Sequence, residues 1–150
     1  MKARYIQNLF SKSLVFRALL IWLGLCILAF VNGALREIVL KPILNVPEPT
    51  ANQISCLTGV LFLTVFTVWY WKPLNIKSMG QALLVGLGWF FATLLFETLV
   101  IDRNLSWTQI VDTYDVFNGQ FWGLVLIWIG LMPLMLYFLL NFRRYPVVFL

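Results

Sequence analysis

Four long stretches of this chain carry no charged side chain, and they constrain the fold more than any other feature. They comprise residues 18–35, 49–71, 78–96 and 116–142, which are 18, 23, 19 and 27 residues long. Uncharged apolar runs of roughly 18 residues or more are typical of transmembrane helices. The chain is also 61% hydrophobic and only 11% charged, too apolar for a water-soluble globule of 150 residues. We therefore predict an all-α membrane protein.

The charged residues are segregated in a way that predicts how the chain is threaded. A four-span arrangement puts all six acidic residues on one side of the membrane: Glu37, Glu48, Glu97, Asp102, Asp112 and Asp115. Eight of the eleven basic residues lie in the terminal segments and the middle loop, on the other side. An excess of Lys and Arg marks the cytoplasmic side. We therefore expect both termini in the cytoplasm, with the bilayer as the partner of the basic residues and no nucleic-acid partner.

The predicted architecture is a single-domain bundle of four transmembrane helices, spanning about residues 15–35, 53–71, 81–101 and 119–142. Three prolines in residues 41–52 indicate an irregular loop between spans one and two. Gly88 and Ala92 in span three have a small-xxx-small spacing that favours close helix packing. Pro133 predicts a kink in span four.

A short amphipathic helix is predicted in the loop between spans three and four. Ser106 and Gln109 match a capping box, which marks a helix start. Apolar residues including Trp107 and Tyr114 then recur at helical spacing, while Asp112 and Asp115 fall on the other face. We expect this helix to lie in the outer membrane interface.

No catalytic constellation is visible in the sequence. Histidine is absent, which excludes His-based triads and His-ligated metals. Cys26 and Cys56 form neither a metal-binding cluster nor a CxxC pair, and their predicted depths differ by about 10 Å, too far for a disulfide. We therefore expect no enzyme activity, cofactor or metal.

Polar side chains do concentrate at the outer ends of spans one, two and three. They are Asn32, Arg36, Glu37, Gln53, Ser55, Thr58, Thr93 and Glu97. Ionisable groups at membrane depth normally turn inward and form pairs, so we expect Arg36 to pair with Glu97. Two interpretations stay open: a structural clasp between the helices, or a binding site for a small polar or cationic solute.

Short motifs near these polar residues resemble a known group of proteins. Residues 32–37 (NGALRE), 53–59 (QISCLTG) and 96–97 (FE) are similar to those of small, uncharacterised bacterial inner-membrane proteins with four predicted spans. The resemblance covers most of the chain and implies a bacterial inner-membrane location and the same architecture. It implies no activity.

Two functional hypotheses follow from the sequence. The first is a non-enzymatic membrane component that acts as an accessory or assembly partner of another membrane protein. The alternative is a small oligomeric transporter or channel for a small polar or cationic solute, which would use the outer polar cluster. The first hypothesis predicts a membrane-protein partner, and the second predicts a homo-oligomer.

Overall fold

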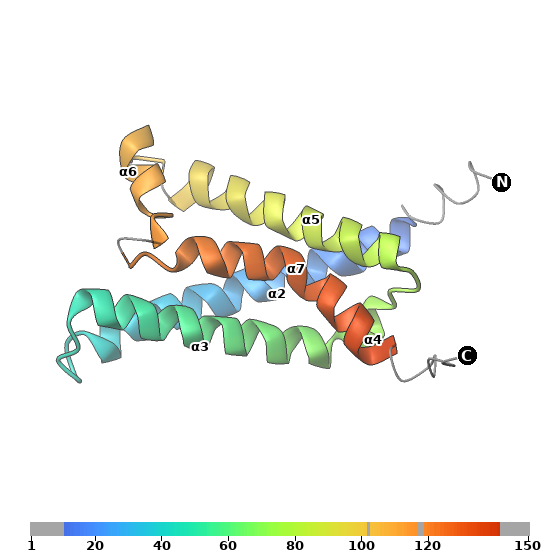
Figure 1. Cartoon of the computed structure of the whole chain (residues 1–150), viewed down its shortest axis with the longest axis horizontal. Coiled ribbons are helices and arrows are strands. Elements are labelled where there is room, and N and C mark those ends of the chain that lie inside the picture. Colours follow the sequence, from blue (N-terminus) through green and yellow to red (C-terminus); the bar gives the residue numbers. More distant parts are fainter. Residues whose placement is uncertain (1–10, 102, 117–118, 142–150) are drawn as a thin grey trace, which may run out of the picture.

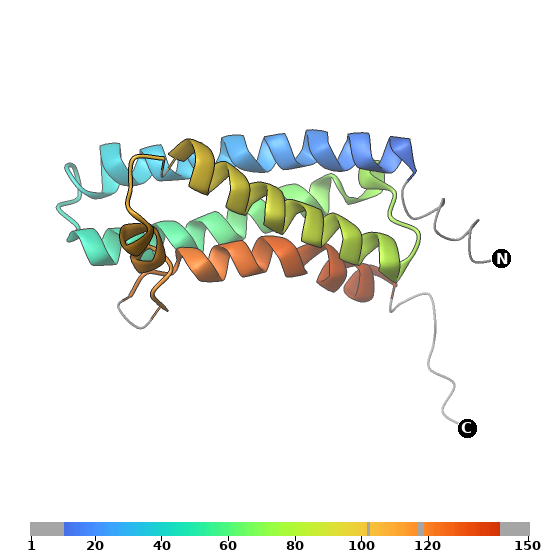
Figure 2. The ribbon, with the colours of Figure 1, turned by 90° about the horizontal axis from the view of Figure 1, so that it is seen from above.

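The computed structural model describes residues 11–101, 103–116 and 119–141, which form helices and turns with no strand among them. Four long helices lie side by side as a bundle (Figures 1 and 2). They are α2 (Lys12–Leu35), α3 (Glu48–Trp69), α5 (Met79–Phe96) and α7 (Trp122–Asn141). The shorter elements are η1 (Arg36–Leu40), α4 (Trp71–Leu74), η2 (Glu97–Ile101) and α6 (Trp107–Asp112).

Within the residues that the structure describes, four helical segments are long and apolar enough to cross a membrane. They are Lys12–Leu40, Glu48–Trp69, Met79–Ile101 and Trp122–Leu140. The prediction of an all-helical protein with four membrane-span-like helices is therefore confirmed. The chain reverses direction between successive spans, so α2 begins and α7 ends at the same end of the bundle (Figure 1). We call this end, near α4, the α4 end, and the opposite one the α6 end.

Each long helix buries one narrow stripe and exposes apolar side chains elsewhere. In α2 the buried residues are Leu14, Ala18, Ile21 and Leu25, three or four positions apart, while Leu19 and Leu23 are about half exposed. Helices with apolar residues on all faces are typical of membrane spans. The exposed faces are therefore suited to lipid.

Local sequence signals explain where most helices begin. Ser11, Ser78 and Ser106 cap α2, α5 and α6, each accepting a hydrogen bond from the backbone N–H three residues on. The predicted loop at residues 41–52 is wrong in its second half, because α3 begins at Glu48. Pro49 lies in the first helical turn, where its missing N–H costs no helical hydrogen bond.

The predicted helix after span three forms, but it is shorter than expected. Both halves of the Ser106–Gln109 capping box are present, and α6 covers Trp107 to Asp112. Tyr114 and Asp115 lie beyond its end, so their assignment to this helix is wrong. The side chains of Trp107 and Val111 are exposed on one face. Placement of this face in a membrane interface stays a prediction.

Helices α5 and α7 pack closely through glycine. A Cβ atom at Gly86 would clash with the carbonyl oxygen of Gly130, so only glycine permits this approach. Gly88, by contrast, has open space where its Cβ would be, and its predicted packing contact does not occur among the described residues. Pro133 is buried inside α7, and this helix changes direction in its second half (Figure 1).

Candidate functional site

A cavity of about 630 Å³ opens at the α6 end of the bundle. Residues from all four long helices, from both π-helical turns and from the segments next to them line it. This volume falls in the range of small-molecule sites, which is roughly 300–1,000 Å³. We call it the polar cavity because its lining includes most of the polar residues singled out in the sequence.

The floor of the polar cavity is apolar and lies well inside the bundle. Leu25, Leu63, Val125 and Ile129 line it, and each is at most 3% exposed. These side chains belong to the same hydrophobic core as Trp89 and Met132. The core therefore closes the cavity toward the α4 end, and its opening faces the α6 end.

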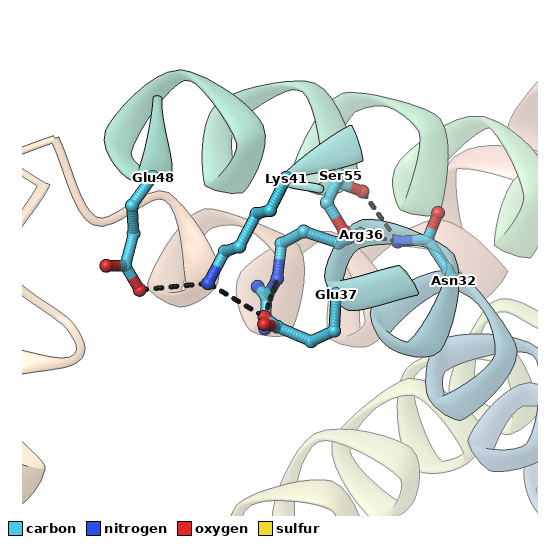
Figure 3. Close-up of polar contacts among 6 residues, drawn as sticks. All are labelled: Asn32, Arg36, Glu37, Lys41, Glu48 and Ser55. Carbon is cyan, nitrogen blue, oxygen red and sulfur yellow. Dashed lines mark hydrogen bonds and ion pairs between the residues drawn. The ribbon is translucent and has the colours of Figure 1, made fainter. Parts of the chain in front are cut away.

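A ladder of charged side chains forms one side of the rim (Figure 3). Arg36 Nε lies 3.0 Å from Glu37 Oε1, and Lys41 Nζ lies 3.0 Å from the same oxygen and 2.9 Å from Glu48 Oε1. The hydrogen bonds to Glu48 first, and to Glu37 second, raise the pKa of Lys41 above its ordinary value. Lys41 therefore bridges two carboxylates beside the cavity.

Two π-helical turns border the cavity, and each begins at a charged residue. The first, η1, starts at Arg36 at the end of α2, and the second, η2, starts at Glu97 at the end of α5. In η1 the backbone N–H of Lys41 donates to the carbonyl of Arg36 at 3.1 Å, the five-residue spacing of a π-turn. Such turns are rare and frequently occur at functional sites.

Asn32 fastens the α2 wall of the cavity to α3. Its Nδ2 donates to the Ser55 carbonyl at 2.7 Å and is 2.9 Å from Ser55 Oγ, and Thr58 Oγ1 donates to Asn32 Oδ1 at 2.9 Å. A Cβ atom on Gly59 would lie 3.1 Å from Asn32 Nδ2. The glycine therefore leaves the space that this amide needs.

Thr93 joins the α5 wall to α2 lower in the bundle. Trp22 Nε1 donates to Thr93 Oγ1 at 3.0 Å, and the Trp22 ring meets Phe96 edge-on with centroids 6.3 Å apart. Deeper still, Trp89 Nε1 donates to the Ala18 carbonyl at 2.9 Å. These contacts fix the spacing of α2 and α5 below the cavity.

The structure brings together most of the polar residues that the sequence singled out. Those that line the cavity are Asn32, Arg36, Glu37, Ser55, Thr93 and Glu97. Thr58 reaches the site through Asn32. Gln53 does not line it; its amide lies beside Gly119, at 3.3 Å from where a Cβ on that glycine would be. The pairing of Arg36 with Glu97 stays a prediction. In the structure Arg36 forms an ion pair with Glu37.

Several residues of the cavity were missed by the sequence reasoning. They are Lys41, Glu48, Asn52, Gln120, Trp122 and the two cysteines. The opposite charges of Lys41 and Glu48 were a usable signal, but the prolines had assigned both to an irregular loop. Cys26 and Cys56 are free thiols that line the same cavity. Among the described residues, no three His, Cys, Asp or Glu side chains are grouped to hold a metal ion.

Comparisons of the chain with protein-family models, with curated proteins and with solved structures find no match. The function is therefore inferred from the cavity and its walls.

Proposed function

We propose that this chain is a non-enzymatic, multi-pass protein of the bacterial cytoplasmic membrane that binds a small polar or cationic solute in the polar cavity. The cavity itself carries the proposal: it has the size of a ligand site and its walls come from all four membrane-span-like helices. The charge asymmetry supports a cytoplasmic α4 end and an external α6 end. The cavity then faces the outside.

The charges of the cavity favour a cation. Among the described residues that line it, three are carboxylates (Glu37, Glu48 and Glu97) and two are cationic (Arg36 and Lys41). Aromatic rings of Phe121 and Trp122 also line the cavity, and such rings attract cations through their faces. A cationic solute would therefore be stabilised by charge and by ring contacts.

One buried polar atom belongs to a side chain that lines the cavity. The Nε1 of Trp122 is buried and has no hydrogen-bond acceptor among the described residues. Buried donors are nearly always satisfied by protein or water. A bound solute with an oxygen acceptor would supply that partner.

The closure of the cavity toward the α4 end supports a role in transport. Leu63 and Ile129 close the cavity toward the α4 end. A transporter in its outward-open state has a cavity that is closed in this way toward the cytoplasm. Four helices enclose little space, so we propose that transport requires an oligomer. Binding is the step that is tested first.

The test is thermal unfolding of the purified protein with two matched sets of solutes. Alkylammonium and carboxylate compounds of equal size are compared on the wild type and on two glycine variants. Gly33 lines the cavity and has open space at its Cβ position, so Gly33→Leu adds a bulky side chain to the cavity wall whose Cβ meets no neighbouring atom. Gly88 has the same open space but does not line the cavity, so Gly88→Leu is the control.

We expect ammonium compounds to raise the unfolding temperature of the wild type and of Gly88→Leu, but not of Gly33→Leu. A ligand at 100 times its dissociation constant stabilises by about 2.7 kcal/mol, well within measurement. Equal shifts in both glycine variants, or no shift in the wild type, would refute solute binding in the cavity.

A second candidate function is an accessory partner of another membrane protein. Gly88 and Ala92 lie one turn apart on α5, and Gly88 is exposed, with nothing near its Cβ position. Small residues on an exposed face allow another helix to approach closely. Purification from gently solubilised membranes decides: a stoichiometric foreign protein that is lost in Gly88→Leu supports this role.

A further inference from the structure

We propose that the ligand is an amphiphile from the surrounding bilayer, with an ammonium-bearing head at the charged rim and one hydrocarbon chain in the lower cavity. This inference rests on the proposed function and specifies its substrate class. It follows from three properties of the cavity: an apolar lower part, a side opening toward the lipid-exposed faces, and a charged rim.

The floor of the cavity presents no polar side chain to a purely polar solute. Its floor is made by Leu25, Leu63, Val125 and Ile129, all of them apolar and buried. Leu25 lies 11 residues before Arg36 on the same wall, a distance of about 16 Å at 1.5 Å rise per residue. A small ion at the rim would leave this depth empty, whereas a hydrocarbon chain would fill it.

The cavity also reaches the outer face of the bundle between α2 and α5. Phe30 of α2 lines the cavity although it is 76% exposed, and so do Phe96 and Ile101 on the other side, at 38% and 56%. In the view of Figure 1 the ribbons of α2 and α5 lie apart toward the α6 end. Side chains that both line a cavity and face outward mark its edge, and on a membrane-spanning bundle that edge adjoins acyl chains.

The rim matches a head group with both a cation and an anion. Glu37, Glu48 and Glu97 offer acceptors for an ammonium group, while Arg36 and Lys41 offer donors for a phosphate. Carboxylates outnumber cations here, so the ammonium contributes more to selection than the phosphate. Glu97 begins η2 at the end of α5, and the rim ladder lies on η1 and at the start of α3 (Figure 3). A head group placed between these segments reaches both.

Native mass spectrometry in a neutral maltoside detergent tests this with three probes. Lysophosphatidylethanolamine carries one chain, a phosphate and an ammonium group. Lysophosphatidylglycerol has the same chain and phosphate without the ammonium, and glycerophosphoethanolamine has the head group without a chain. The readout is the fraction of protein that carries one bound probe at equal concentrations.

We expect lysophosphatidylethanolamine to bind at least about fivefold more than lysophosphatidylglycerol, since a charge-assisted hydrogen bond is worth at least about 1 kcal/mol. Glycerophosphoethanolamine should bind weakly. Gly33→Leu should reduce lysophosphatidylethanolamine binding to the level of lysophosphatidylglycerol, while the control Gly88→Leu should retain it. Co-elution of the two variants at the same volume in size-exclusion chromatography shows that both are folded.

The possible failures are distinguishable. If glycerophosphoethanolamine binds as well as the chain-bearing probe, the cavity takes a small polar solute, so the amphiphile is wrong and the proposed function stands. If the two lysolipids bind equally, the ammonium selection is wrong. If Gly33→Leu binds every probe like Gly88→Leu, the probes do not occupy the cavity and the amphiphile proposal is refuted. If no probe binds while alkylammonium compounds still stabilise the wild type, only the amphiphile is refuted.

Discussion

Gly86 of α5 faces the backbone carbonyl of Gly130 in α7 so closely that no side chain fits between the two helices. Pro133 follows Gly130 by three residues and lies 3.6 Å from where a Cβ on Gly86 would be. Proline removes one helical hydrogen bond and bends its helix. The tight crossing and the bend in α7 therefore occupy the same place, below the cavity.

This relationship predicts different outcomes for two glycines only two residues apart. Gly86→Ala should destabilise the protein by about 1–3 kcal/mol, the usual cost of overpacking a core. Gly88→Ala should be neutral or stabilising by up to about 1 kcal/mol, because alanine favours the helix and meets nothing. Unfolding in graded sodium dodecyl sulfate measures both. Equal stability of the two variants would show that α5 and α7 do not cross at Gly86.

The amide of Asn32 supports a second prediction, about the α2–α3 wall. Asn32→Ala removes its hydrogen bonds to Ser55 and Thr58, and Thr58 keeps a bond to the Ile54 carbonyl at 3.0 Å. Interhelical hydrogen bonds in membrane proteins contribute about 0.6–1.7 kcal/mol, so we expect a loss in that range. The double variant Asn32→Ala with Ser55→Ala should lose less stability than the sum of the losses in the two single variants. Strict additivity would mean that the two side chains are not coupled.

A third prediction separates the clasp from the solute site. If Arg36 and Glu97 form a structural pair, Arg36→Ala and Glu97→Ala should show a coupling above about 0.5 kcal/mol in a double-mutant cycle of unfolding. If Glu97 instead recognises a ligand, the cycle is additive and Glu97→Gln weakens ammonium binding. Arg36→Ala with Glu37→Ala is the reference cycle, because these two residues contact each other at 3.0 Å.

The spans could be predicted from the sequence because their signal is a sum over many residues. An error at one boundary does not change the number of predicted spans. The second span was predicted to begin near Gln53, for example, whereas α3 begins at Glu48. The faces of the helices were harder to predict. The small-residue spacing pointed to Gly88 and Ala92 as packing residues, and only the crossing of α5 with α7 shows that Gly86 is the glycine in close contact.

The sequence was enough to predict which polar residues lie near the candidate site, but not the backbone geometry around them. The predicted depth in the membrane was enough to group Asn32, Ser55, Thr93 and Glu97, because residues at similar depths in a helix bundle lie near each other. The backbone geometry around Arg36 could not be predicted, because the π-turn that begins at this residue has no sequence signature. Such a turn adds one residue between hydrogen-bond partners and so changes the direction of every side chain after it.

The threading across the membrane gives the last prediction, and the exposed side chains supply its probes. Ile43 at the α6 end is 66% exposed and Met79 near the α4 end is 50% exposed, and neither is charged. Cysteines at these positions leave the charge distribution that sets orientation unchanged. Cys26 and Cys56 line the cavity, so both are first replaced by alanine. In intact cells a membrane-impermeant maleimide should label Ile43→Cys and spare Met79→Cys, and permeabilisation should expose both. Labelling of Met79→Cys alone would place the α6 end, and the mouth of the cavity, in the cytoplasm, and a solute taken from outside would then have no route to this site.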